Sequence, residues 1–154
     1  MEYLIVKWLH ILSSTFLFGT GIGSAFYMLF TSLSGDTRAL AVVTRYVVIA
    51  DWVFTTPTIV LQPLTGFYLM HLAGFPLTTP WILHSLGLYF LAGACWLPVV
   101  WMQIRMRDMA RVAASSGREL PPLYWRYMRA WVALGIIAFV SLVVVFYLMV
   151  AQPT

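Results

Sequence analysis

Apolar residues fill four long stretches of this chain, and shorter polar segments separate them. The stretches run approximately over 3–30, 45–71, 81–103 and 130–150. Each has about 20 residues or more, which is enough for an α-helix to cross the roughly 30 Å hydrocarbon layer of a membrane. In lipid, a helix satisfies its own backbone hydrogen bonds. The pattern therefore predicts an all-α, polytopic membrane protein, a single domain folded as an antiparallel four-helix transmembrane bundle over residues 1–154.

The connecting segments carry residues that start and stop helices. Asp36 follows a Ser-Gly turn and is expected to be the N-cap of the second helix, which then begins before the membrane. Thr79 and Pro80 are typical of an N-cap followed by proline in the first turn. Gly117 ends one helix, and two consecutive prolines then open the next. The last two helices are thus expected to extend beyond the bilayer as an arginine-rich hairpin over 104–129.

The arginines lie in only two of the three connections. Arg38 and Arg45 are in or beside the first connection, and six more belong to the third: Arg105, Arg107, Arg111, Arg118, Arg126 and Arg129. Positively charged loops are retained in the cytoplasm. We therefore expect a multi-pass protein with both connections and the hairpin cytoplasmic and both termini on the outer side.

Composition excludes the other broad classes of protein. With 62% hydrophobic residues, 9% charged residues and a mean hydropathy of +0.88, no soluble domain fits. The single cysteine, Cys95, excludes a disulfide framework and a thiolate cluster. The net charge of +4 comes mainly from arginines at helix ends, which match membrane lipids and not nucleic acid. The first stretch is too long for a signal peptide and starts with Glu2, so we expect it in the mature protein.

Aromatic residues gather near the ends of the stretches, which is typical of a belt at the membrane–water interface. These residues are Trp8, Trp52, Trp81, Trp101, Trp125, Trp131 and Tyr147.

The first stretch contains ionisable residues that need an explanation. Tyr3, Lys7, His10 and Ser14 follow one another at helical spacing and form one polar stripe. An ionisable group inside a membrane costs free energy and requires a partner or a function. Further along the same helix, the small residues Gly19 and Gly23 permit close approach of another helix, in a homo-oligomer or in a larger complex.

All three histidines are expected in the outer half of the bundle, on three different helices. They are His10, His71 and His84. Imidazole is a usual axial ligand of haem iron, and helix bundles hold such cofactors between facing helices. Lys7 is then positioned to neutralise a haem propionate. Two alternatives remain: hydrogen-bonded histidines at the interface, or a zinc or copper site, for which a completing carboxylate or thiol is missing.

The second stretch has a polar seam along one face. Its members recur at intervals of four and three residues: Asp51, Thr55, Thr58, Gln62 and Thr65. Pro57 and Pro63 interrupt the backbone ladder beside the seam and free the carbonyl groups of Val53 and Ile59. The seam can serve as a proton path in which protons enter at Asp51. Alternatively, it provides polar contacts between helices, with Asp51 paired to Arg45 or Arg105.

Several segments of the chain resemble known membrane proteins. Val6-Lys7-Trp8-Leu9-His10-Ile11, with the small residues that follow, resembles the first helix of HemJ-type protoporphyrinogen oxidases and CopD-like membrane proteins. Further segments, from Ala50-Asp51-Trp52 through Gly93-Ala94-Cys95-Trp96 to Gln152-Pro153, are similar to an uncharacterised bacterial family of predicted integral membrane proteins in that group. The resemblance covers essentially the whole chain.

The resemblance implies a haem-b-binding redox protein of the bacterial inner (cytoplasmic) membrane, so that both termini would be periplasmic. In the Lys-x-x-His motif His10 would be the axial ligand, with His71 or His84 as the second, and electrons would pass to or from quinone or a porphyrin-like substrate. Lys7 is the only lysine, so the third-helix lysine of HemJ-type chains is absent and their oxidase activity does not carry over. The alternatives are a small membrane carrier or proton/metal conduit using the polar seam, and a non-catalytic subunit of a larger membrane complex.

Overall fold

The computed structural model describes residues 1–153, which form helices and no strand. The helical segments are α1 (Glu2–Leu33), α2 (Thr37–Ala50), η1 (Asp51–Thr55), α3 (Thr56–Ala73), α4 (Pro80–Ser116) and α5 (Pro122–Ala151). The segment η1 is a single π-helical turn that joins α2 to α3, so 37–73 is one continuous helix. Four helices are thus long and apolar enough to cross a membrane, which confirms the predicted all-α class.

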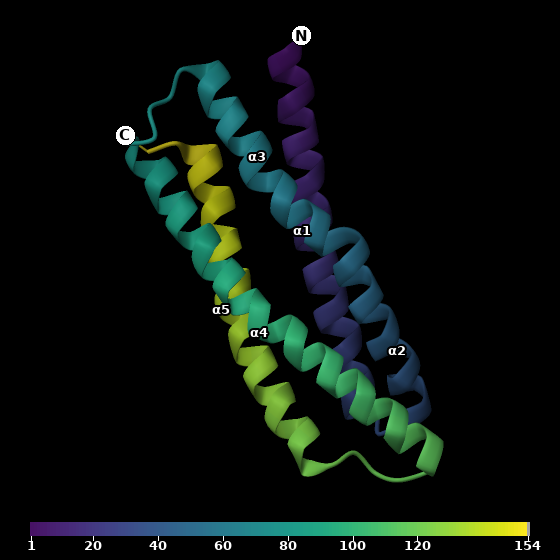
Figure 1. Ribbon diagram of the computed structural model, residues 1–154. Helices are drawn as coiled ribbons and strands as arrows, with labels where there is room; N and C mark the ends of the chain where they lie inside the picture. The colour runs from purple at the N-terminus through teal and green to yellow at the C-terminus, as the bar shows by residue number, and fades with distance from the viewer. Residues whose placement is uncertain (154) are drawn as a thin grey trace.

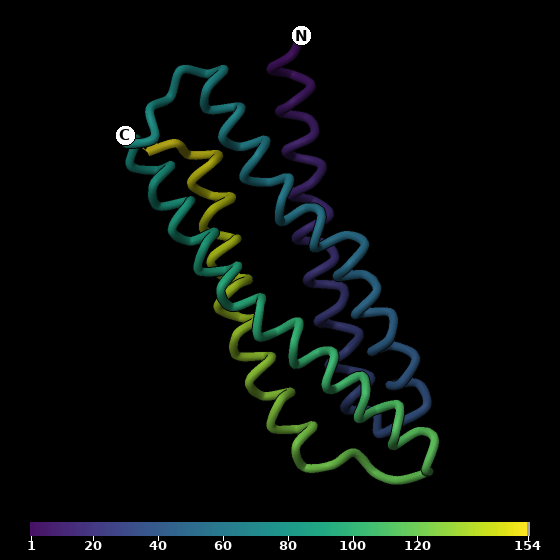
Figure 2. The backbone as a smooth tube through the Cα atoms, viewed as in Figure 1, coloured from purple at the N-terminus to yellow at the C-terminus, as the bar shows by residue number. Residues whose placement is uncertain are grey.

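The helices run up and down along one common direction (Figure 1). Both termini and the α3–α4 connection lie at one end, which we call the termini end. The α1–α2 and α4–α5 connections lie at the opposite end, the loop end. Helix α1 packs against α2 and α3, whereas α4 packs against α5 and α2. Towards the termini end, the α1–α3 pair diverges from the α4–α5 pair (Figure 2).

The helix ends follow the local chemistry that the sequence predicted. The Asp36 carboxylate accepts hydrogen bonds from the backbone N–H groups of Arg38 and Ala39, at 3.0 Å each. Thr79 is the N-cap of α4 and precedes a proline in the first turn. Gly117 ends α4 with a φ of 63°, in the left-handed region that a residue without a side chain adopts easily. Because α4 and α5 both reach the loop end, the arginine-rich hairpin is helical apart from a short connection.

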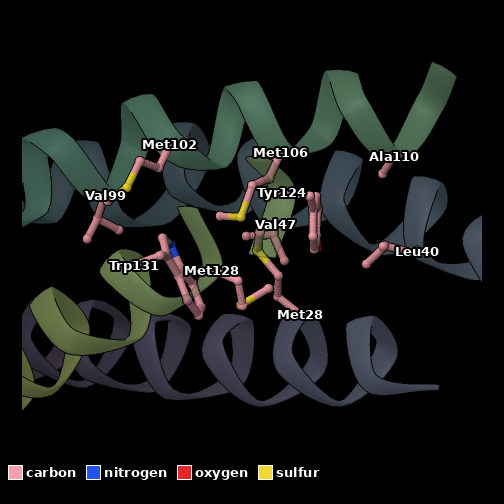
Figure 3. Packing of buried hydrophobic residues seen from close by; sticks show 10 residues of the cluster. All are labelled: Met28, Leu40, Val47, Val99, Met102, Met106, Ala110, Tyr124, Met128 and Trp131. Carbon is pink, nitrogen blue, oxygen red and sulfur yellow. The ribbon is translucent and has the colours of Figure 1, made fainter. Parts of the chain in front are cut away.

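The cluster of buried hydrophobic residues lies towards the loop end (Figure 3). Met28 of α1, Met106 of α4 and Tyr124 of α5 are all 0% exposed there. The Tyr124 hydroxyl lies 2.7 Å from Ser32 Oγ, which itself donates to the backbone oxygen of Met28 at 2.6 Å. Methionine side chains fill irregular spaces between helices. This core fixes how α1, α4 and α5 are placed around the middle of the bundle.

Most of the remaining apolar surface faces outwards. Only 11–33% of the residues in the spanning windows are buried within the monomer, and the lowest share is that of α5. Such a surface is unstable in water and stable in hydrocarbon. The fold is therefore that of a membrane-embedded bundle in contact with lipid.

Candidate functional site

Helix 37–73 changes its hydrogen-bond pattern at Asp51. The backbone oxygen of Asp51 accepts from the N–H of Thr56, five residues later, and from Thr56 Oγ1 at 2.9 Å. Pro57 follows directly and has no N–H to continue an ordinary α-helical ladder. Single π-helical turns of this kind are frequent at functional sites. Here the turn leaves Asp51 and Thr55 buried, at 5% and 4% exposure.

The Asp51 carboxyl group is only partly hydrogen-bonded. Oδ1 accepts from Thr55 Oγ1 at 2.9 Å, and the side chain of Gln103 approaches the carboxyl group from α4. Oδ2 has no partner. A buried carboxyl oxygen in a membrane helix therefore remains open to a further donor.

The expected pairing of Asp51 with an arginine is wrong. In the part of the chain that the structure describes, the one ion pair joins Arg107 to Asp108, at 2.9 Å. Arg105 lies over the ring of Trp101 at 5.6 Å, and Arg45 lies over that of Tyr46 at 6.0 Å. Both arginines are exposed near the loop end, where their charges remain in or near water while their apolar stems cover neighbouring rings.

Asp51 lies on the wall of a cavity of about 460 Å³ between α1, η1, α4 and α5. Most of the residues lining it are apolar or aromatic. Gly21, Gly93 and Gly135 also line it, and a Cβ atom added to any of them would meet no neighbouring atom within 4 Å. A volume of this size lies within the range of about 300–1,000 Å³ that is usual for small-molecule sites.

Within residues 1–153, the four buried side-chain polar atoms that lack a hydrogen-bond partner all belong to residues lining this cavity. They are Asp51 Oδ2, Gln103 Oε1, Trp96 Nε1 and Trp131 Nε1. A buried polar atom without a partner costs about 1–3 kcal/mol. Four of them in one apolar cavity make this the leading candidate for a binding site.

Trp131 was expected in the interfacial belt, and the structure corrects this. It is 5% exposed and packs in the core beside Val99 and Met128 (Figure 3). The physical reason is that Trp131 lies on the face of α5 that packs against core residues of α4. Its indole N–H is buried and has no hydrogen-bond partner among the described residues.

Tyr89 provides a hydrogen-bond donor for a backbone oxygen that a proline leaves free beside the cavity. Pro63 provides no N–H for the backbone oxygen of Ile59, as the sequence predicted, and the Tyr89 hydroxyl donates to that oxygen at 2.6 Å. This hydrogen bond joins α4 to α3. Both Tyr89 and Ile59 line the cavity.

A second polar cluster surrounds His10. Nδ1 of His10 lies 2.7 Å from Thr65 Oγ1, and the Thr65 hydroxyl donates to the backbone oxygen of Leu61 at 2.6 Å. Thr65 Oγ1 therefore accepts, which places the proton on Nδ1 and leaves the Nε2 lone pair free for another partner. The ring rests on α3 at Gly66, where a Cβ atom would lie 3.4 Å from His10 Cε1.

Gln62 completes this cluster, together with a residue that the sequence reasoning missed. Gln62 Nε2 donates to Ser13 Oγ at 2.6 Å and to the backbone oxygen of His10 at 2.9 Å. Ser13 lies three residues after His10, so helical spacing could have identified it. The predicted Ser14 instead donates to the backbone of Ile11 within its own helix, at 2.7 Å.

The structure does not gather the other expected haem residues around His10. His71 and His84 are exposed, and no group of three or more His, Cys, Asp or Glu side chains within 1–153 is arranged to hold a metal ion. Lys7 is also exposed, with Nζ 5.8 Å from the centre of the Tyr3 ring. Ligation by His10 together with one of the other histidines stays a prediction.

The polar seam faces the protein interior but is divided into two parts. Asp51, Thr55, Thr58 and Gln62 are buried, and Thr65 is half-buried. The Thr58 hydroxyl donates to backbone oxygens of its own helix, at 2.7 and 3.0 Å. Among the described residues, no side-chain hydrogen bond joins the Asp51–Thr55 pair to the Gln62–Thr65 part.

The predicted close-packing face of α1 is not used within the monomer. A Cβ atom added at Gly19 or Gly23 would meet no neighbouring atom within 4 Å.

The fold and the cavity define a class: a four-helix integral membrane protein with a largely apolar cavity between its helices. Residues 4–153 match the family described as "Predicted integral membrane protein (DUF2269)", and the chain belongs to that family. Neither the curated proteins nor the solved structures contain a match to the chain.

Proposed function

We propose that this protein binds a lipophilic small molecule within the membrane, in the cavity between α1, η1, α4 and α5. The observation that carries this proposal is that the four residues with an unpartnered buried polar atom all line one largely apolar cavity. Hydrocarbon cannot hydrogen-bond to these atoms, whereas a ligand with an apolar body and polar groups can. Such binding suits a small membrane carrier, one of the alternatives that the sequence left open.

Filling the cavity tests the proposal. A leucine at Gly135 meets no backbone obstacle at its Cβ atom and occupies ligand space; Gly87→Leu is the matched control, because Gly87 is equally unobstructed and does not line the cavity. The probe is pyrenylmethanol, a neutral lipophilic fluorophore. Its binding is measured by energy transfer from tryptophan, with the protein in nanodiscs of zwitterionic lipid.

The wild type and Gly87→Leu should show saturable binding. In Gly135→Leu the affinity should fall by about tenfold or more, because overpacking a filled site costs about 1–3 kcal/mol. Absence of saturable binding to the wild type, or equal affinity in both variants, would refute the proposal.

A specific observation favours haem b binding by His10 as a second candidate function. A ligating histidine usually donates its other ring N–H to an acceptor that fixes its orientation, and Thr65 is positioned to provide that acceptor for His10. Lys7 would neutralise a propionate, and His71 or His84 would be the second ligand. Bound haem would supply a one-electron couple for exchange with quinone or a porphyrin-like substrate.

Absorption spectra of the purified protein, oxidised and then reduced, test this second candidate. A Soret band with sharp reduced bands is expected from the wild type expressed with haem available, and His10→Ala should abolish it. Thr65→Val should weaken haem retention and broaden the spectrum, because the ring loses its orienting acceptor. Ser14→Ala is the control, since Ser14 bonds only within its own helix. A colourless wild type would exclude haem binding.

A further inference from the structure

The polar atoms of the cavity specify the chemical class of its ligand, an inference that rests on the proposed function. Two of the four unpartnered atoms are acceptors, Asp51 Oδ2 and Gln103 Oε1. They belong to neighbouring side chains, because Gln103 approaches the Asp51 carboxyl group from α4. Both residues are at least nine-tenths buried, at 5% and 3% exposure. This end of the cavity therefore requires hydrogen-bond donors.

Where Asp51 is ionised, its carboxylate also requires a positive charge. Within 1–153, no Lys, Arg or His side chain forms an ion pair with Asp51, because the one ion pair described is Arg107–Asp108. A carboxylate in a low-dielectric interior is costly unless a counter-charge and hydrogen bonds accompany it. A proton on Asp51 would remove the charge and let Oδ2 donate to Gln103 Oε1. A ligand cation with N–H groups instead stabilises the ionised carboxylate and donates to both acceptors.

We propose that the cavity binds a lipophilic ammonium ion, with Asp51 as its counter-charge and Gln103 as its second hydrogen-bond acceptor. An ammonium group with at least two N–H donors serves both acceptors, whereas a hydroxyl group donates only once. Thr55 holds the other carboxyl oxygen, at 2.9 Å, and so orients Asp51 for this contact.

The other residues that line the cavity indicate the shape and polarity of the rest of the ligand. Phe18, Phe139 and Tyr89 are among the aromatic residues lining it, and they favour a flat apolar body. Trp96 lies on the same helix as Gln103, about 10 Å away along the axis at about 1.5 Å per residue. Its free indole N–H, with that of Trp131, favours a ligand that carries a hydrogen-bond acceptor such as a carbonyl or ether oxygen.

A pair of probes of nearly the same shape tests the charge requirement. Pyrenylmethylammonium and pyrenylmethanol differ in the cationic group and are titrated by energy transfer from tryptophan, in nanodiscs of zwitterionic lipid. The wild type should bind the ammonium ion about tenfold more tightly or better, since removing one partner from a buried charge pair is costly. The preference should persist at high salt, which screens surface adsorption and not a buried pair.

Asp51→Asn keeps the shape of the side chain and removes its charge, so the preference for the ammonium ion should disappear. Asp108→Asn is the matched control, because it removes a negative charge from the loop end outside this cavity, and it should leave the preference unchanged. If Asp51→Asn does not fold, Gln103→Leu and the salt series on the wild type replace it, and Gln103→Leu should weaken ammonium binding more than alcohol binding.

The outcomes separate the two proposals. Equal affinity of the wild type for both probes, or a preference retained by Asp51→Asn, would overturn the ammonium assignment and leave the cavity as a site for neutral lipophilic molecules. Saturable binding of neither probe would overturn both the assignment and the proposed function.

Discussion

At the scale of single residues, the buried hydrogen bond between Ser32 and Tyr124 gives a prediction about stability. Ser32 Oγ donates to Met28, so the Tyr124 hydroxyl is the donor in the 2.7 Å contact between them. Tyr124→Phe removes this donor and should lower the free energy of unfolding by about 1 kcal/mol. Ser32→Ala leaves the buried hydroxyl of Tyr124 without an acceptor and should cost about 1–3 kcal/mol.

Reversible unfolding in mixed micelles measures both changes. The double variant should be less destabilised than the sum of the single ones, because it removes the orphaned donor together with its lost partner. A larger loss of stability in Tyr124→Phe than in Ser32→Ala would contradict this assignment of donor and acceptor.

At the scale of helices, the sequence was sufficient for the elements and their ends. Hydrophobic length predicted the four helices, and Asp36, Thr79 and Gly117 predicted where helices begin and end, because capping depends only on residues close in the chain. The freed carbonyl of Ile59 was predicted from Pro63 for the same reason. Its donor, Tyr89, was not predicted, because it comes from another helix.

The cavity could not be predicted, for two physical reasons. Its polar atoms come from η1, α4 and α5, and only the packing of these segments brings them together. Asp51 was identified as unusual, but its neighbour Gln103 occurs at the end of an apolar stretch, where a polar residue needs no explanation. The π-helical turn could not be predicted either. It depends on how Pro57 interrupts the backbone hydrogen bonds of the helix within a packed bundle.

At the scale of the whole molecule, the two ends of the bundle differ in charge. The arginines lie towards the loop end, from Arg38 and Arg45 in α2 to Arg129 in α5, whereas Lys7 near the termini end is the only lysine. Cytoplasmic loops carry the excess of positive residues. We therefore predict that the loop end faces the cytoplasm, which places the His10 cluster nearer the outer surface than Asp51.

Cysteine labelling in intact bacterial spheroplasts tests this orientation, because the one native cysteine, Cys95, is buried at 7% exposure and should give a low background. Thr78 is exposed in the α3–α4 connection, and Ser116 is exposed at the end of α4, beside the α4–α5 connection. A membrane-impermeant maleimide should label Thr78→Cys in intact cells and Ser116→Cys only after lysis. The native chain is the control for background. The reverse pattern would place the arginines outside, and Asp51 would then lie nearer the outer surface than the His10 cluster.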